Sequence, residues 1–168
     1  TEYGTLYTLA ELEAIRKVCT KYDMPLFIDG ARLGYALTAS GNDVTIEDIA
    51  RLADVFYIGG TKVGAMFGEA VVFTHGNMPK HFVTIVKQHG ALLAKGWLLG
   101  LQFDTLFTDG LYLRIARHAN DAADRIREVL VERGYTLTFD APTNQIFITL
   151  DNATSERLQR NVRLGFME

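Results

Sequence analysis

The sequence is poor in cysteine, in basic residues and in long apolar runs, and each scarcity excludes a class of protein. A single cysteine, Cys19, excludes an intramolecular disulfide and any cysteine-based metal cluster. The net charge of −3 lacks the basic excess that nucleic-acid binding normally needs. No apolar run approaches the ~20 residues of a membrane span, and no signal peptide is visible. We therefore expect a cytoplasmic protein that binds neither nucleic acid nor membrane.

Two short apolar runs in the first third of the chain end abruptly in glycine and charged residues. Residues 25–32 read Pro-Leu-Phe-Ile-Asp-Gly-Ala-Arg, and residues 55–62 read Val-Phe-Tyr-Ile-Gly-Gly-Thr-Lys. Such runs are typical of buried parallel strands, and open α/β sheets bind their ligands beyond the carboxyl ends of such strands. We expect Asp29, Arg32 and Lys62 to meet at that edge. An acid, an arginine and a lysine gathered there suit pyridoxal phosphate.

Two capping boxes and the recurrence of apolar residues predict the helices of an α/β fold. Thr8 with Glu11, and Thr45 with Asp48, each stand directly before apolar residues at helical spacing. The helices expected from these and later patterns cover residues 9–22, 31–40, 46–52, 79–107 with a break at 89–90, and 111–133, and a last helix begins at about 155 with Thr154 as its cap.

Five apolar or alternating runs predict strands. Residues 26–28 and 54–58 should pair in parallel through a right-handed crossover, whereas 70–73 follows so short a return that it should pair antiparallel. Residues 135–139 and 145–150 alternate well enough to be strands. On the long helix before them, the expected buried face consists of apolar residues at helical spacing: Ile115, Ala119, Ala122, Ile126, Val129 and Leu130.

Each charged residue of the expected site also has a purely structural interpretation. Lys62 is a surface lysine, as most are, or a nucleophile that small neighbours allow a ligand to approach and that forms a Schiff base with a carbonyl. Asp29 caps the next helix, or it pairs with a protonated pyridine nitrogen. Arg32, about one helical turn further on, makes a salt bridge with Asp29 or binds a substrate carboxylate.

Weaker candidates lie elsewhere in the chain. Cys19 falls on an apolar helix face and is expected to be an inert buried thiol. His89 adjoins the expected helix break, where it is a surface or core residue, or approaches a ligand or a subunit interface. Lys87 and Lys95 flank it and either serve a phosphate or lie in solvent. Residues 143–144 form a turn or contact a substrate.

Three strings of residues carry a resemblance to a known family. They are Thr-Glu-Tyr-Gly-Thr-Leu-Tyr at 1–7, Phe-Ile-Asp-Gly-Ala-Arg-Leu at 27–33 and Tyr-Ile-Gly-Gly-Thr-Lys at 57–62. Together they resemble the low-specificity threonine aldolases, members of the β-eliminating lyase group of fold-type I pyridoxal-phosphate enzymes. The specific part is the Asp-Gly-Ala-Arg-Leu string followed at a distance by a lysine that ends a strand.

The resemblance implies a cofactor, pyridoxal 5′-phosphate, and a role for each site residue. Lys62 would bind the cofactor covalently, and Asp29 would hold its pyridine nitrogen. Arg32 would bind the substrate carboxylate near the phenolic oxygen of the cofactor. Ala31 and Thr61 would also contact the cofactor, and no metal is implied.

The implied activity is that of an aldehyde-lyase that cleaves β-hydroxy-α-amino acids, such as threonine or allo-threonine, to glycine and an aldehyde. One alternative is another fold-type I enzyme, an aminotransferase or an amino-acid β-lyase, which would use the same residues. The other is a non-catalytic α/β interaction fragment. The partner expected for the enzyme is a small amino-acid substrate.

The implied fold is α/β and has two parts. Residues 1–107 would be the later part of a large cofactor-binding domain with a mostly parallel sheet and helices, and residues 108–168 would begin a smaller α+β C-terminal domain. We expect the chain to be a piece of a longer protein and inactive by itself. The whole protein is expected as a homodimer or homotetramer, in which Lys87 and Lys95 reach towards the cofactor phosphate of a neighbouring subunit.

Overall fold

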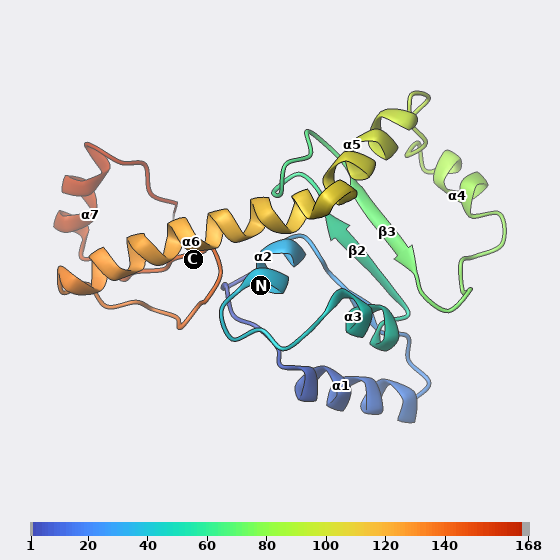
Figure 1. The fold of residues 1–168 in the computed structure, drawn as a ribbon, viewed down its shortest axis with the longest axis horizontal. Coiled ribbons are helices and arrows are strands. Elements are labelled where there is room, and N and C mark those ends of the chain that lie inside the picture. The colour runs from blue at the N-terminus through green and yellow to red at the C-terminus, as the bar shows by residue number, and fades with distance from the viewer. Residues whose placement is uncertain (1, 166–168) are drawn as a thin grey trace.

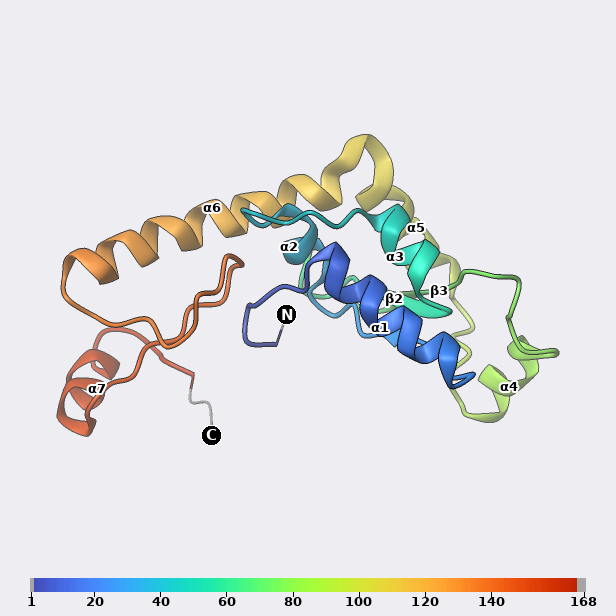
Figure 2. The same cartoon turned by 90° about the horizontal axis from the view of Figure 1, so that it is seen from below.

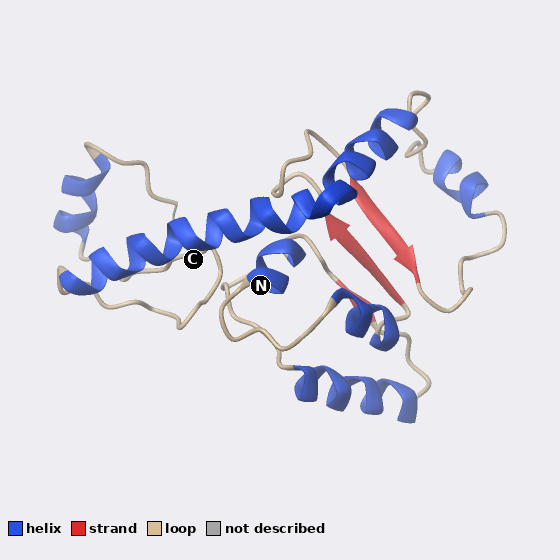
Figure 3. Cartoon of the chain, in the orientation of Figure 1, coloured by secondary structure: helices blue, strands red, loops and turns tan. Residues whose placement is uncertain are grey.

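A computed structural model describes residues 2–165 and contains a small sheet flanked by helices (Figure 1, Figure 3). The strands are β1 (Phe27–Ile28), β2 (Val55–Gly59) and β3 (Glu69–Phe73). The helices are α1 (Leu9–Lys21), α2 (Leu33–Thr38), α3 (Ile46–Leu52), α4 (Phe82–Gln88), α5 (Trp97–Phe107), the 3-10 turn η1 (Thr108–Gly110), α6 (Leu111–Glu132) and α7 (Asn152–Gln159).

The sheet has the strand order β1-β2-β3, and both pairings confirm the sequence prediction. β1 pairs in parallel with β2, with Phe27 opposite Val55. β3 runs antiparallel to β2, with Val55 opposite Phe73. The short return between them contains Gly64 and Gly68 at φ of +101° and +86°, values that side chains disfavour. These glycines allow the chain to turn back at once instead of crossing over.

Local capping fixes the starts of α1 and α3 as predicted. Thr8 accepts a hydrogen bond from the Glu11 amide, and the Glu11 carboxylate accepts one from the Thr8 amide in return. Thr45 and Asp48 repeat the arrangement at α3. Each box satisfies amides that the first helical turn leaves unpaired.

The second helix begins later than predicted, at Leu33 rather than Ala31. The Ala31 amide donates to the Asp29 carboxylate in a tight turn, and Arg32 lies outside the helical region at φ −126°, ψ 28°. The alternative in which Asp29 caps this helix is therefore wrong, because Arg32 is the residue at the N-cap.

The stretch predicted as one interrupted helix over residues 79–107 is two helices with a wide gap. His81, at φ +58°, stands directly before α4, and Gly90, at φ +68°, follows its end. Left-handed residues cannot continue a right-handed helix, so α4 stays short. The chain resumes helical geometry only at α5.

The buried face of α6 differs from the prediction. Ile126 and Val129 are 54% and 52% exposed, because the helix packs on α2 and α5 over its first half. Ala122 is also exposed, whereas Ile115 and Ala119 are partly buried against the core. The residues of α6 that are fully buried are Tyr112, Ala116, Asn120 and Ala123.

The two strands predicted after α6 are not formed. One isolated bridge joins Leu137 to Ile148, and the segments around it are irregular. The last helix begins at Asn152 rather than 155. Its cap is Asp151, whose carboxylate accepts hydrogen bonds from the amide and hydroxyl of Thr154. In two perpendicular views, α7 and α4 lie at opposite ends of the molecule (Figure 1, Figure 2).

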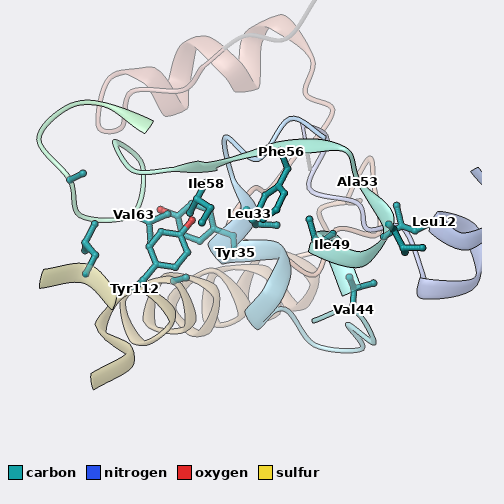
Figure 4. Close-up of a cluster of buried hydrophobic side chains, with 14 residues drawn as sticks. Leu12, Leu33, Tyr35, Val44, Ile49, Ala53, Phe56, Ile58, Val63 and Tyr112 are labelled. Carbon is teal, nitrogen blue, oxygen red and sulfur yellow. The ribbon is translucent and has the colours of Figure 1, made fainter. Parts of the chain in front are cut away.

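One hydrophobic core joins the sheet to α2, α3 and the start of α6 (Figure 4). Phe56 and Ile58 of β2 point into it, and Leu33 and Tyr112 meet them from the helices. Cys19 is a buried free thiol, as expected. Among residues 2–165, no helix combines the length and apolarity needed to cross a membrane.

Candidate active site

The candidate site lies where the parallel strands β1 and β2 end. Asp29 directly follows β1, and the pairing of Ile28 with Phe56 brings it beside Tyr57. Glycine permits the close contact of the two strand ends. A Cβ added to Gly30 would lie 1.6 Å from the Tyr57 carbonyl oxygen, and the Gly30 carbonyl accepts from the Gly59 amide at 2.9 Å. The backbone thus requires glycine at this position.

Asp29 is an exposed carboxylate held from one side. Its Oδ1 accepts hydrogen bonds from the Tyr57 hydroxyl and, at 2.9 Å, from the Ala31 amide. The bond from Tyr57, followed by that from Ala31, lowers the pKa of Asp29, and the charge of Lys62 acts in the same direction. Within residues 2–165, Oδ2 has no hydrogen-bond donor. Asp29 is therefore ionised and keeps one oxygen free.

Tyr57 is the neutral member of this pair. Burial and then the Asp29 carboxylate raise the pKa of Tyr57 to about 12, so its hydroxyl donates throughout the physiological range. The sequence analysis missed this residue. Its signal was the alternation of β2, in which Phe56 and Ile58 face the core while Tyr57 faces the other way, towards Asp29.

The loop that carries Lys62 is held by a carboxylate from the neighbouring strand. Glu69 Oε2 accepts the Gly60 amide at 2.6 Å, and Oε1 accepts the Thr61 hydroxyl at 3.4 Å. Glu69 reaches the loop because it stands opposite Gly59 in the β2–β3 ladder. This contact spans nine residues of sequence and was also missed.

Two buried tyrosines hold the same loop from the helical side. The Tyr112 hydroxyl donates to the Gly59 carbonyl at 3.0 Å and accepts the Gly34 amide at 3.1 Å. The Tyr35 hydroxyl donates to the Lys62 carbonyl. Burial raises the pKa of both phenols, that of Tyr112 to about 12. The backbone of the lysine loop is therefore fixed to α2 and α6.

The side chains predicted for the site are only partly brought together. Lys62 is exposed, and within residues 2–165 its amine has no hydrogen bond or ion pair. Thr61 is exposed beside it, and Ala31 lies next to Asp29. Arg32 is half-buried, and no ion pair joins it to Asp29 in the described chain, so the salt-bridge alternative is wrong.

The weaker candidates lie on other segments of the chain. Lys87, His89 and Lys95 are exposed on α4 and the segment after it, and α4 stands away from the carboxyl end of β2 (Figure 1). Thr143 is fully buried, and its hydroxyl donates to the Gly4 carbonyl at 3.1 Å. Thr143 is thus a structural contact in this chain.

Comparison with protein families matches residues 1–153 to the family described as β-eliminating lyase. Low specificity L-threonine aldolases from Pseudomonas aeruginosa and from Pseudomonas sp. (strain NCIMB 10558) are 32% and 33% identical to this chain over 160 and 162 residues. Each alignment covers 95% of this chain and 46% of the relative. The chain therefore spans about half the length of the curated relatives it matches.

Among solved structures, a threonine aldolase from Leishmania major superimposes with a TM-score of 0.92 at 43% sequence identity. The match covers 96% of this chain and 47% of that chain. The α/β architecture described above is thus that of a threonine aldolase, over the part of the fold that this chain contains.

Proposed function

The chain belongs to the β-eliminating lyase family, and on that premise we propose that the whole protein cleaves threonine or allo-threonine to glycine and an aldehyde. One observation carries the proposal. An ionised Asp29 and an exposed Lys62 follow adjacent parallel strands in a chain that superimposes closely on a threonine aldolase. Open α/β sheets bind ligands at that edge.

Pyridoxal 5′-phosphate is the cofactor of this family, and the residues at the strand ends fit it. An ionised carboxylate with a free oxygen suits a protonated pyridine nitrogen, and an exposed primary amine suits an aldehyde. When bound, the cofactor supplies the electron sink that cleavage of an amino acid next to its α-carbon requires.

We assign the site residues from this fit. Lys62 binds the cofactor aldehyde covalently, on a loop that Glu69 hydrogen-bonds. Asp29 keeps the pyridine nitrogen protonated. Arg32, whose guanidinium fork matches a carboxylate, binds the substrate and orients its scissile bond. Ala31 and Thr61, the neighbours of these residues in sequence, contact the cofactor.

We further propose that the whole protein is a homodimer or homotetramer with two domains in each subunit. Residues 1–107 belong to the cofactor-binding domain and residues 108–168 begin the smaller one, with α6 as the connecting helix. Lys87 and Lys95 would then serve a neighbouring subunit, because both are exposed and α4, which carries Lys87, stands away from the carboxyl end of β2 (Figure 1). Residues 78–101, which carry them, expose many apolar side chains and contain no acid.

The first test is the absorbance spectrum of the full-length protein after incubation with pyridoxal phosphate and removal of the excess. We expect a yellow band of lysine-bound cofactor that borohydride abolishes. Lys62→Ala should lack the band, whereas the control Lys17→Ala, on the exposed side of α1, should keep it. A folded full-length protein that stays colourless would contradict the proposal.

Product analysis then separates the aldolase from its relatives. The yellow protein should convert threonine to glycine and acetaldehyde. A keto acid among the products would instead indicate an aminotransferase or a β-lyase built on the same residues.

A further inference from the structure

Tyr57 contacts the site, yet the proposed function gives it no role. We propose that Tyr57 is a positioning residue for Asp29: its hydroxyl holds one carboxylate oxygen so that the other is presented, ionised, to the ring nitrogen of the cofactor. The inference rests on the proposed function, because it concerns how the same site binds pyridoxal phosphate.

The position of Tyr57 is fixed by the sheet. Ile28 stands opposite Phe56 in the parallel pairing, so Asp29 and Tyr57 are the next residues along two adjacent strands. Phe27, which points the same way as Asp29, packs against the Tyr57 ring with centroids 6.1 Å apart. The phenol is thus held by neighbours on the same face of the sheet while its hydroxyl reaches Asp29.

The hydrogen bonds on Asp29 are one-sided. Both donors, the Tyr57 hydroxyl and the Ala31 amide, bind Oδ1, and Oδ2 has no donor within residues 2–165. The χ2 torsion of an aspartate has broad, roughly two-fold minima, so a carboxylate held by one hydrogen bond can rotate about it. A second donor to the same oxygen restricts this rotation and leaves Oδ2 directed away from both donors.

The charges around the pair favour this arrangement. The positive charge of Lys62 acts on Asp29, and the negative charge of Glu69 acts on Tyr57. Because the pKa of Tyr57 is about 12, its hydroxyl remains a donor to the ionised Asp29 at neutral pH. The contact therefore needs no change of protonation state at neutral pH.

Tyr57→Phe in the full-length protein removes the hydroxyl and keeps the ring. In the cofactor-free protein, NMR titration should show the pKa of Asp29 rising towards its ordinary value of 3.8. The dissociation constant for pyridoxal phosphate should increase about tenfold, the effect of one charge-assisted hydrogen bond. Tyr22→Phe, at the exposed tyrosine that caps the C-terminus of α1, is the matched control and should change neither quantity.

A double-mutant cycle separates positioning from a general structural effect. In the Asp29→Asn background, Tyr57→Phe should change the dissociation constant by less than about twofold, because its target is gone. An equal loss of affinity for pyridoxal phosphate in the wild-type and Asp29→Asn backgrounds would overturn the inference.

The outcomes also separate this inference from the proposed function. A wild-type protein that binds the cofactor, with a Tyr57→Phe variant of unchanged affinity and unchanged Asp29 titration, would overturn the role of Tyr57 alone. A wild-type protein that binds no pyridoxal phosphate would overturn the proposed function and, with it, the presentation of Asp29.

Discussion

At the scale of single residues, the site depends on how closely two strand ends can approach. The Gly30 carbonyl accepts the Gly59 amide, and the Cβ positions of both residues are filled by backbone atoms of the opposite segment. No side chain can move aside to relieve such a contact. The position of Asp29 therefore depends on Gly30, a residue that has no side chain.

Gly30→Ala should destabilise the protein strongly, because its new Cβ would lie 1.6 Å from the Tyr57 carbonyl oxygen. We expect a loss of about 3 kcal/mol or more in the free energy of unfolding, measured by urea titration. Gly100→Ala is the control. Gly100 lies within α5, and within residues 2–165 no atom outside its own stretch of helix backbone lies within 4 Å of an added Cβ. Alanine there should therefore stabilise the helix by about 0.5–1 kcal/mol. Equal changes in the free energy of unfolding at the two positions would contradict the close contact of Gly30 with the Tyr57 carbonyl.

Tyr112→Phe tests the buried hydroxyl that joins α2 to the lysine loop. The change would leave the Gly34 amide without its partner and remove one donor from the Gly59 carbonyl. Because Tyr112 is buried, water cannot replace the hydroxyl, and we expect a cost of about 1–3 kcal/mol in urea unfolding. A cost near zero would mean that Tyr35 and Glu69 hold the loop without the Tyr112 hydroxyl.

The sequence predicted charged residues for the candidate site but not the residues that form hydrogen bonds with them. Asp29 and Lys62 were predicted as site residues because strand ends that carry glycine and charge have a local signature. Tyr57 and Glu69 have no such signature, because their contacts cross between strands and depend on register. A tyrosine within a strand is ordinary, and only its pairing with Asp29 makes it part of the site.

At the scale of elements, the same division between local and distant causes decides which predictions held. The capping boxes of α1 and α3 were confirmed because each is complete within four residues. The buried face of α6 was predicted wrongly because the apolar pattern of this 22-residue helix does not show which half of it packs on the core. The strands after α6 were predicted from alternation alone, and one isolated bridge is what forms.

The capping box of α3 makes stability depend on pH in a defined direction. Hydrogen bonds from Thr45, and then from Arg51, lower the pKa of Asp48 below its ordinary 3.8. The ionised form therefore stabilises the fold fully above the unfolded-state pKa, and that contribution is lost as the pH falls through the lower folded-state value. Asp48→Asn should lower the melting temperature at pH 7, and its difference from wild type should shrink below about pH 4.

The control for this pH dependence is Glu47→Gln. Glu47 is the other acid in the first turn of α3 but makes no capping bond within residues 2–165. Its difference from wild type should change less with pH than that of Asp48→Asn. If the melting temperatures of the two variants change with pH in parallel, negative charge at the helix N-terminus, and not the capping box, causes the pH dependence.

At the scale of the whole molecule, the least expected feature is the apolar surface of residues 78–101. Val83 and Trp97 are 64% and 66% exposed there, and Lys80, Lys87 and Lys95 supply charge of one sign only. The sequence predicted helices over most of this stretch, but it did not show whether their apolar side chains meet their own chain or another. Exposed apolar patches of this kind mark interaction surfaces.

Trp97→Ser in the full-length protein should therefore shift the assembly towards smaller species in analytical ultracentrifugation. A buried aromatic anchor at an interface typically contributes about 2 kcal/mol or more, so the dissociation constant of the oligomer should rise by about thirtyfold or more. Val18→Ser, at an exposed apolar position of α1 on another part of the molecule, is the control and should leave the sedimentation profile unchanged. If the subunits share their sites through Lys87 and Lys95, the Trp97 variant should also bind pyridoxal phosphate more weakly as the protein is diluted.

A Trp97→Ser variant that assembles as the wild type does would mean that the subunit interface lies elsewhere and that this surface binds another partner.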